Sequence, residues 1–255
     1  DFATLYARGG WDIVVIDEAS QCDVPSALPL LYRAKHLVII GDPNQLKHVA
    51  TLHGPSDREA ASKFGVAPDA YLYNAHSLFD IAQRSVAHQP GTILLREHYR
   101  SHAQIIGFSN EEFYGRELLL RTDMERRGVP PDFLRDGGGA FWIHVDGRAE
   151  HPSGGSAFNL AELEVLQELV PRLLERLVQY ETGDFKFTLG IVTPYREQAN
   201  RIQGWVSQRY GDTSQILVGT AHTFQGDERD IVIFSPVLGP GLSEGSLNWL
   251  DRTKN

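Results

Sequence analysis

The sequence contains one cysteine, Cys22, among its 255 residues. One cysteine cannot form an internal disulfide, and it cannot supply the set of thiolates that a cysteine-based zinc site requires. Disulfide-stapled secreted domains and zinc ribbons are therefore excluded. Because chains without disulfides are typical of reducing compartments, we expect an intracellular, cytoplasmic location.

Long apolar runs and an excess of basic residues are also missing. No apolar run approaches the ~20 residues that span a bilayer, so we expect no membrane segment. The formal net charge is −9, which excludes a histone-like basic coat but not a local basic groove. With 42% hydrophobic and 22% charged residues, the composition is that of a globular protein with one large domain or two ordinary ones.

Several common catalytic signatures do not occur. The sequence has no Gly-x-Ser-x-Gly elbow and no His-Glu-x-x-His motif, so neither a serine hydrolase nor a zinc protease is indicated. It also has no Gly-x-x-x-x-Gly-Lys-Ser/Thr phosphate-binding loop. Because the chain starts on Asp1, runs directly into an apolar strand and stops soon after another apolar segment, we expect it to be a piece of a longer protein.

Short apolar strands alternate with helical stretches, which is the pattern of an α/β fold. The expected strands are 12–16, 37–40, 92–95, 140–144, 187–193, 216–220 and 230–236. Leucines at helical spacing predict a helix after Asn159, which can cap it, with Glu162 in the first turn and a kink at Pro171. A second helix is expected over 197–209.

Stretches rich in glycine, proline and charge mark three expected surface insertions, 53–70, 121–139 and 150–156. The third expected strand ends near residue 95, and we place a domain boundary there. This boundary separates a truncated first part, 1–95, from a more complete second part, 96–255.

The stretch Val-Val-Ile-Asp-Glu-Ala-Ser-Gln, 14–21, ends an apolar strand on two adjacent carboxylates, Asp17 and Glu18. Such a pair at a strand end is costly unless it holds a cation or performs acid–base chemistry. Nucleoside triphosphatases present a magnesium-holding aspartate in this way, and a neighbouring glutamate can polarise the attacking water. The alternative is an ordinary surface turn.

The next apolar strand is followed by Gly-Asp-Pro-Asn-Gln, which supplies Asp42 and Gln45. A glutamine amide both donates and accepts hydrogen bonds, so at a strand end it can report whether a γ-phosphate is present. The alternative is a β-turn, because Asp-Pro-Asn is common turn chemistry. Two such strand ends separated by one crossover favour nucleotide chemistry.

Two adjacent residues, Tyr99 and Arg100, follow the third expected strand. An aromatic ring can stack on a base, and a guanidinium can neutralise charge that develops on a transferred phosphoryl group. The alternative is a helix start with an ordinary ion pair among Arg96, Glu97 and Arg100. The segment alone leaves both interpretations open.

Two later strands end in polar residues suited to a nucleic acid. Thr193, Pro194 and Tyr195 offer a hydroxyl and a ring to a phosphate or a base, although a proline in a first helical turn is also common. His222 lies in Ala-His-Thr-Phe-Gln-Gly-Asp-Glu. Because no nucleophile motif accompanies it, we interpret it as a hydrogen-bonding residue and not as a catalytic base.

In this order, the stretches resemble the motifs of superfamily 1 helicases, in the branch that carries Asp-Glu-Ala-x-Gln. This branch includes the nonsense-mediated-decay RNA helicases and many bacterial DNA helicases. The matching segments are 17–21, 41–46, 98–101, 193–198, 218–220 and 224–228. The resemblance covers nearly the whole chain. It implies two RecA-like lobes with parallel sheets and ATP in the cleft between them, the first lobe truncated and the second nearly complete.

The resemblance also implies a role for each matching residue. Asp17 would hold Mg²⁺, and Glu18 would activate the attacking water. Gln45 would sense the γ-phosphate, and Arg100 would act as an arginine finger. Further residues implied in ATP binding are Gln21, Asp42, Tyr99, Gln225, Gly226 and Glu228. Residues implied in contact with single-stranded nucleic acid, with DNA weakly favoured over RNA, are Thr193, Pro194, Tyr195, Thr220 and His222.

The sequence departs from the family pattern in two places. The phosphate-binding loop that should precede 17–21 is missing, and Ser-Leu-Asn-Trp-Leu-Asp-Arg-Thr-Lys-Asn, 246–255, is a run-up to the last, arginine-bearing motif or a poor match to it. We therefore expect the parent protein to couple ATP hydrolysis to translocation and unwinding, and this chain alone to be inactive. The alternatives are a non-catalytic nucleic-acid- or protein-binding module on a degenerate helicase fold, and a nucleotide kinase, which explains fewer of the motifs.

Overall fold

A computed structural model describes residues 9–52, 54–87, 91–124, 139–183 and 185–252. The chain divides into two compact units. The first consists of Asp1–His98 and Ser109–Arg121, and the second of Tyr99–Phe108 and Thr122–Asn255. Each unit contains helices and parallel strands, which confirms the predicted α/β class. The assignment of the two parts to RecA-like lobes with a boundary near residue 95 stays a prediction.

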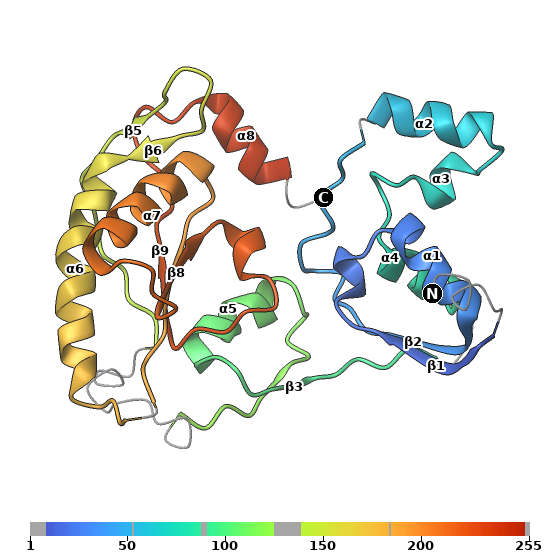
Figure 1. Ribbon diagram of the computed structural model, residues 1–255, viewed down its shortest axis with the longest axis horizontal. Helices are drawn as coiled ribbons and strands as arrows, with labels where there is room; N and C mark the ends of the chain where they lie inside the picture. Colours follow the sequence, from blue (N-terminus) through green and yellow to red (C-terminus); the bar gives the residue numbers. More distant parts are fainter. Residues whose placement is uncertain (1–8, 53, 88–90, 125–138, 184, 253–255) are drawn as a thin grey trace. The chain divides into compact units, whose positions relative to one another are not determined.

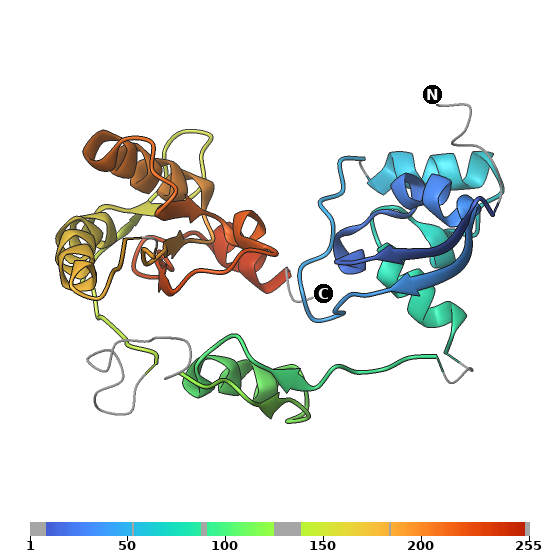
Figure 2. The ribbon, with the colours of Figure 1, turned by 60° about the horizontal axis from the view of Figure 1, so that its bottom comes forward.

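The first unit is built on two parallel strands, β1 (Trp11–Ile16) and β2 (Ala34–Ile39), joined by helix α1 (Val24–Arg33). The α1 start is stabilised because the Asp23 carboxylate accepts a hydrogen bond from the Ser26 amide at 2.8 Å. Helices α1 and α4 (Leu78–Ser85) pack on one face of this sheet (Figures 1 and 2). The buried residues of this core are Ile16, Ala19, Ala27 and Leu78.

The opposite face of the β1–β2 sheet is open. Ile13 and Val15 of β1 are 62% and 59% exposed, and Val38, the partner of Val15 in β2, is 45% exposed. Parallel sheets are normally covered on both faces, and their strands are therefore apolar throughout. The sequence of β1 and β2 fits such a doubly covered sheet, but the described residues cover only one side of it.

The stretch predicted as the first insertion folds into two helices, α2 (Gly54–Lys63) and α3 (Pro68–Tyr71), with His53 outside the described residues. The predicted strands at 92–95 and 140–144 are wrong. Short parallel strands form instead at β3 (Glu97–His98) and β4 (Leu119–Leu120). A segment with high strand propensity forms a strand only when a second segment pairs with it. Among the described residues, no segment pairs with either of these two apolar runs.

The second unit contains a parallel sheet in the order β8-β7-β9. The three predicted strands are confirmed with shorter bounds, as β7 (Leu189–Val192), β8 (Ile216–Gly219) and β9 (Ile231–Phe234). The two predicted helices are confirmed as α6 (Leu160–Val178), which continues through Pro171, and α7 (Arg196–Tyr210) (Figure 1). One cluster joins both helices to β7 and β8: Leu166, Val170, Leu189, Ile191, Ile202, Val206, Ile216 and Val218.

The start of α6 follows the sequence prediction closely. The Asn159 side chain accepts hydrogen bonds from the amides of Ala161 and Glu162, at 3.0 and 3.3 Å.

Helix α5 (Ala103–Glu112) contributes residues to both units. The remaining elements are η2 (Ala19–Gln21), β5 (Ala149–Glu150), β6 (Phe158–Asn159), η5 (Ala221–Phe224) and α8 (Glu244–Arg252).

The predicted insertion at 150–156 contains the turn between the antiparallel strands β5 and β6. Most of the predicted insertion at 121–139 lies outside the described residues. Within the described part of the chain, none of the helices has the length and apolar character needed to cross a membrane.

Candidate nucleotide and nucleic-acid site

Two predicted site residues, Asp17 and Glu18, follow β1 directly. The Glu18 amide donates to Asp17 Oδ1 at 2.8 Å, and Gln21 Nε2 donates to Glu18 Oε2 at 3.0 Å. Glu18 has φ 50°, in the left-handed region that non-glycine residues rarely adopt. Strained backbone of this kind clusters at functional sites, where the surrounding structure holds it in place. The predicted base therefore sits in a constrained turn, held by a third predicted residue, Gln21.

The loop after β2 lies against the loop after β1. The Asp42 amide donates to Ser20 Oγ at 3.2 Å, and the Ala19 amide donates to the Ile40 carbonyl at 2.8 Å. A Cβ at Gly41 would lie 2.7 Å from the Phe79 ring and 3.1 Å from the Ser20 nitrogen, so glycine is required for this approach. The carboxyl ends of the two neighbouring strands thus bring their polar residues together, as parallel pairing predicts.

The Asp42 carboxylate organises its own loop. Its Oδ1 accepts the Asn44 amide at 2.9 Å, and its Oδ2 accepts Gln45 Nε2 at 3.1 Å. The turn interpretation and the site interpretation are therefore both compatible with this loop. The structure also brings in Tyr114, which the sequence analysis missed, because its hydroxyl donates to Asp42 Oδ2 at 2.5 Å. The two residues are 72 positions apart, and nothing in one sequence pairs them.

In the second unit the structure brings together two predicted site residues, Arg100 and Glu228. Arg100 Nε lies 2.7 Å from Glu228 Oε1, and their side chains are 58% and 49% exposed. Glu97 Oε1 lies 3.7 Å from Arg121 Nε, and the alternative ion pair among Arg96, Glu97 and Arg100 stays a prediction. Tyr99, which precedes Arg100 in the sequence, is exposed.

The predicted nucleic-acid residues differ strongly in burial. Thr193 and Tyr195 are 0% and 3% exposed, and the Tyr195 hydroxyl donates to the Ser246 carbonyl at 3.3 Å. Burial raises the pKa of Tyr195. These two side chains therefore have little surface to offer a nucleic acid. Pro194 and Thr220 are half-buried, and His222 is exposed.

The ends of β7 and β8 are nonetheless adjacent, because the Thr193 amide donates to the Gly219 carbonyl at 3.1 Å. The chain then turns through η5 to Gln225, which is half-buried, and Gly226, whose φ of 77° favours glycine. Beyond it, a hydrogen bond from the Arg229 guanidinium at 2.8 Å lowers the pKa of Asp227. Because Asp227 and Arg229 flank Glu228, this bond constrains the loop around Glu228.

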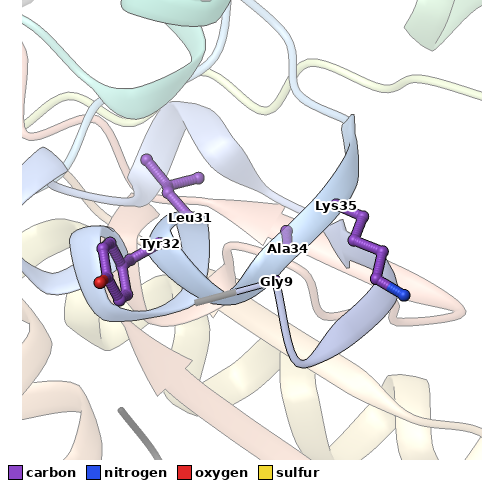
Figure 3. Close-up of a pocket in the computed structure, with 5 residues that line it drawn as sticks. All are labelled: Gly9, Leu31, Tyr32, Ala34 and Lys35. Atoms are coloured by element: carbon purple, nitrogen blue, oxygen red, sulfur yellow. The ribbon is translucent and has the colours of Figure 1, made fainter. Parts of the chain in front are cut away.

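A hollow of about 550 Å³ lies elsewhere in the first unit, near the start of β2 (Figure 3). Its lining residues are Gly9, Leu31, Tyr32, Ala34 and Lys35, and Figure 3 shows Tyr32 and Lys35 pointing away from each other. The predicted site residues of this unit follow the opposite, carboxyl ends of β1 and β2, so the hollow is separate from them. Among the described residues, no group of three or more His, Cys, Asp or Glu side chains could hold a metal ion.

Comparisons with known proteins identify the family to which the chain belongs. Two family models, each described as an AAA domain, match residues 2–53 and 74–247. The chain is 31% identical over 232 residues to Helicase sen1 of Schizosaccharomyces pombe, which covers 88% of this chain and 12% of the relative. It is 29% identical over 248 residues to an uncharacterized ATP-dependent helicase of Mycoplasma genitalium, covering 89% of this chain and 20% of the relative.

A human relative, named probable helicase senataxin, is 24% identical over 247 residues, which are 95% of this chain and 9% of the relative. The chain thus spans about a tenth to a fifth of the length of these three relatives. One family model matches more than half of the chain, and the related proteins are named helicases. The chain therefore belongs to the AAA-domain family of superfamily 1 helicases.

Proposed function

We propose that this chain is part of an ATP-dependent helicase that couples ATP hydrolysis to translocation on, and unwinding of, nucleic acid. The observation that carries the proposal is the joined pair of loops after β1 and β2. Glu18 is held by Gln21 in one loop, Gln45 is held by Asp42 in the other, and the Ser20–Asp42 bond connects the two. An ordinary turn requires neither the strained Glu18 nor the connection between the loops.

In this proposal Asp17 holds Mg²⁺. The residue fits the role, because it is an exposed carboxylate directly after a strand, and Mg²⁺ on a nucleotide needs only one or two carboxylates besides the phosphates. Bound Mg²⁺ would neutralise charge on the phosphates of ATP. Glu18 orients and deprotonates water, Gln45 contacts the γ-phosphate, and Arg100 stabilises charge that develops on the transferred group.

The remaining predicted residues divide between ATP and the nucleic acid. Residues proposed to contact ATP are Gln21, Asp42, Tyr99, Gln225, Gly226 and Glu228. For single-stranded nucleic acid, with DNA weakly favoured, exposure supports Pro194, Thr220 and His222 more than the buried Thr193 and Tyr195. We propose that the latter two act through the backbone shape of the loop after β7.

The test is ATP hydrolysis by the full-length protein that contains this chain, measured without nucleic acid, with single-stranded DNA and with single-stranded RNA. We expect one of the two nucleic acids to stimulate ATP hydrolysis, which identifies the nucleic acid along which the protein translocates. The purified 255-residue chain, which has no phosphate-binding loop, is the matched control and should be inactive. A full-length protein that binds nucleic acid without hydrolysing ATP would favour the non-catalytic binding module instead.

A further inference from the structure

The loop after β2 is held by a second part of the first unit, the adjacent residues Phe113 and Tyr114. The Tyr114 hydroxyl donates to Asp42 Oδ2 at 2.5 Å, and Asn44 Nδ2 donates to the Phe113 carbonyl at 3.0 Å. Because these two hydrogen bonds join the loop to adjacent residues, they fix both its position and its orientation. Neither Phe113 nor Tyr114 has a role in the function proposed above.

Both Gln45 and Tyr114 donate to the same oxygen, Asp42 Oδ2. The other oxygen of Asp42 accepts the Asn44 amide. The bond from Tyr114 is short and goes to a charged acceptor, which is the stronger class of hydrogen bond. Tyr114 therefore fixes the carboxylate that in turn holds the Gln45 amide. Without the hydroxyl, the carboxylate can rotate and Gln45 loses its fixed acceptor.

The segment that carries Tyr114 is itself well held. Gly115 and Arg116, with φ of 56° and 64°, turn the chain back toward α5. The Asn110 side chain closes this turn, because it accepts the Leu118 amide at 2.9 Å and donates to the Leu118 carbonyl at 3.2 Å. Because the backbone around Tyr114 is already fixed, its side chain can position another residue with little further loss of conformational entropy.

The state of the Tyr114 hydroxyl is also suited to this task. Tyr114 is half-buried, and burial together with the Asp42 carboxylate raises the pKa of Tyr114 well above its ordinary value. Both effects disfavour the phenolate, because it would be desolvated and would lie beside a second negative charge. The hydroxyl therefore remains a donor at neutral pH and well above it.

We infer that Tyr114 is a positioning residue for Gln45: it holds the Asp42 carboxylate, and the carboxylate holds the glutamine amide in the orientation that contacts a γ-phosphate. This inference rests on the proposed function for the role of Gln45. Tyr114 itself contacts no reacting group in this account. Its effect on ATP turnover passes through Asp42 and Gln45.

The first test is a double-mutant cycle in the full-length protein, with Tyr114→Phe, Gln45→Ala and both together. We expect Tyr114→Phe to lower the nucleic-acid-stimulated kcat about tenfold, the effect of one hydrogen bond to a charged group, while the Kd for ATP stays within about twofold. In the Gln45→Ala background the same change should have no further effect on kcat. Tyr32→Phe, at an exposed tyrosine in the same unit, is the matched control.

Equal losses of kcat from Tyr114→Phe in both backgrounds would overturn the inference, since the tyrosine would then act independently of Gln45. A wild-type protein without ATPase activity would contradict the proposed function itself, and with it the role of Gln45. Active wild type with an unaffected Tyr114→Phe variant would contradict only the inference. The two failures are therefore distinguishable.

The second test needs no ATP and uses the 255-residue chain. NMR detects the side-chain amide of Gln45, and the signal is assigned by its absence in Gln45→Ala. We expect Tyr114→Phe to shift this signal and speed its hydrogen exchange, while Tyr32→Phe leaves it unchanged. An unmoved Gln45 signal in Tyr114→Phe would show that the hydroxyl does not hold the glutamine, and would overturn the inference.

Discussion

The two units hold their strand-end residues in different ways. In the first unit the sheet has two strands and one open face, and hydrogen bonds between Ser20, Asp42 and Tyr114 hold the loops in place. In the second unit Thr193 and Tyr195 are buried, and Tyr195 packs in a cluster with Ala149, Ala157 and Val237. The first site is therefore organised by polar contacts and the second by packing.

This difference predicts which substitutions should change ATP chemistry and which should change folding stability. Site residues of the first unit, held by partly exposed polar contacts, should show small effects of substitution on folding and large effects on chemistry. Residues held by packing should show the reverse. The Arg100–Glu228 pair is an exception in the second unit, because both of its side chains are about half exposed.

The largest expected effect is on chemistry in the second unit. Arg100→Ala in the full-length protein should lower ATP turnover about 10³-fold, because an arginine finger stabilises transition-state charge. ATP binding should change much less, and the free energy of unfolding by less than about 0.5 kcal/mol, because exposed ion pairs contribute little. Steady-state kinetics, equilibrium binding and urea denaturation measure the three quantities. Equal losses in binding and turnover would contradict the assigned role.

Core truncation compares the two sheets directly. Ile191→Ala, at a fully buried β7 position, should lower the free energy of unfolding by about 4 kcal/mol, through lost burial and a residual cavity. Val15→Ala, on the open face of β1, should cost less than about 1 kcal/mol. Urea denaturation of both variants in the 255-residue chain provides the comparison. Equal costs would mean that the outer face of β1 is covered in solution.

A buried polar network in the second unit should produce an intermediate effect. Glu162 is 8% exposed, and its Oε2 accepts the Ser235 hydroxyl at 2.5 Å and the Val237 amide at 3.2 Å. Glu162→Gln should cost about 2 kcal/mol, because one acceptor is replaced by a donor that faces other donors. The exposed neighbour Glu164 supplies the control, since Glu164→Gln should change the unfolding free energy by less than about 0.5 kcal/mol.

The smallest expected effect concerns strain in the first unit. Glu18→Gly should raise the free energy of unfolding by about 0.5 kcal/mol, because glycine adopts the left-handed conformation without penalty and this relief exceeds the lost bond to Gln21. Glu59→Gly, at an exposed helical position in α2, should lower it by about 1 kcal/mol. Destabilisation by both changes would show that Glu18 is not strained in solution.

Local features of this fold were predictable from the sequence. The Asn159 cap and the leucine spacing predicted α6, because both signals act within a few residues. The strands predicted at 92–95 and 140–144 failed for the converse reason, since a strand needs a partner that local sequence does not identify.

The same limit applies to the candidate site. The strand-end residues Asp17, Glu18 and Asp42 were found from their position after apolar runs. Tyr114 was missed because its partner is 72 residues away. The burial of Thr193 and Tyr195 was also not predictable, since it depends on how the ends of β7 and β8 meet other elements.

In the proposed function Glu18 activates the water that attacks ATP, and this role is tested by comparing wild-type with Glu18→Gln full-length protein. The amide keeps the size of the side chain but cannot accept a proton. We predict that Glu18→Gln lowers nucleic-acid-stimulated ATP turnover at least about 100-fold while ATP binding is retained. Turnover within twofold of wild type, with ATP binding intact, would show that Glu18 does not activate the attacking water.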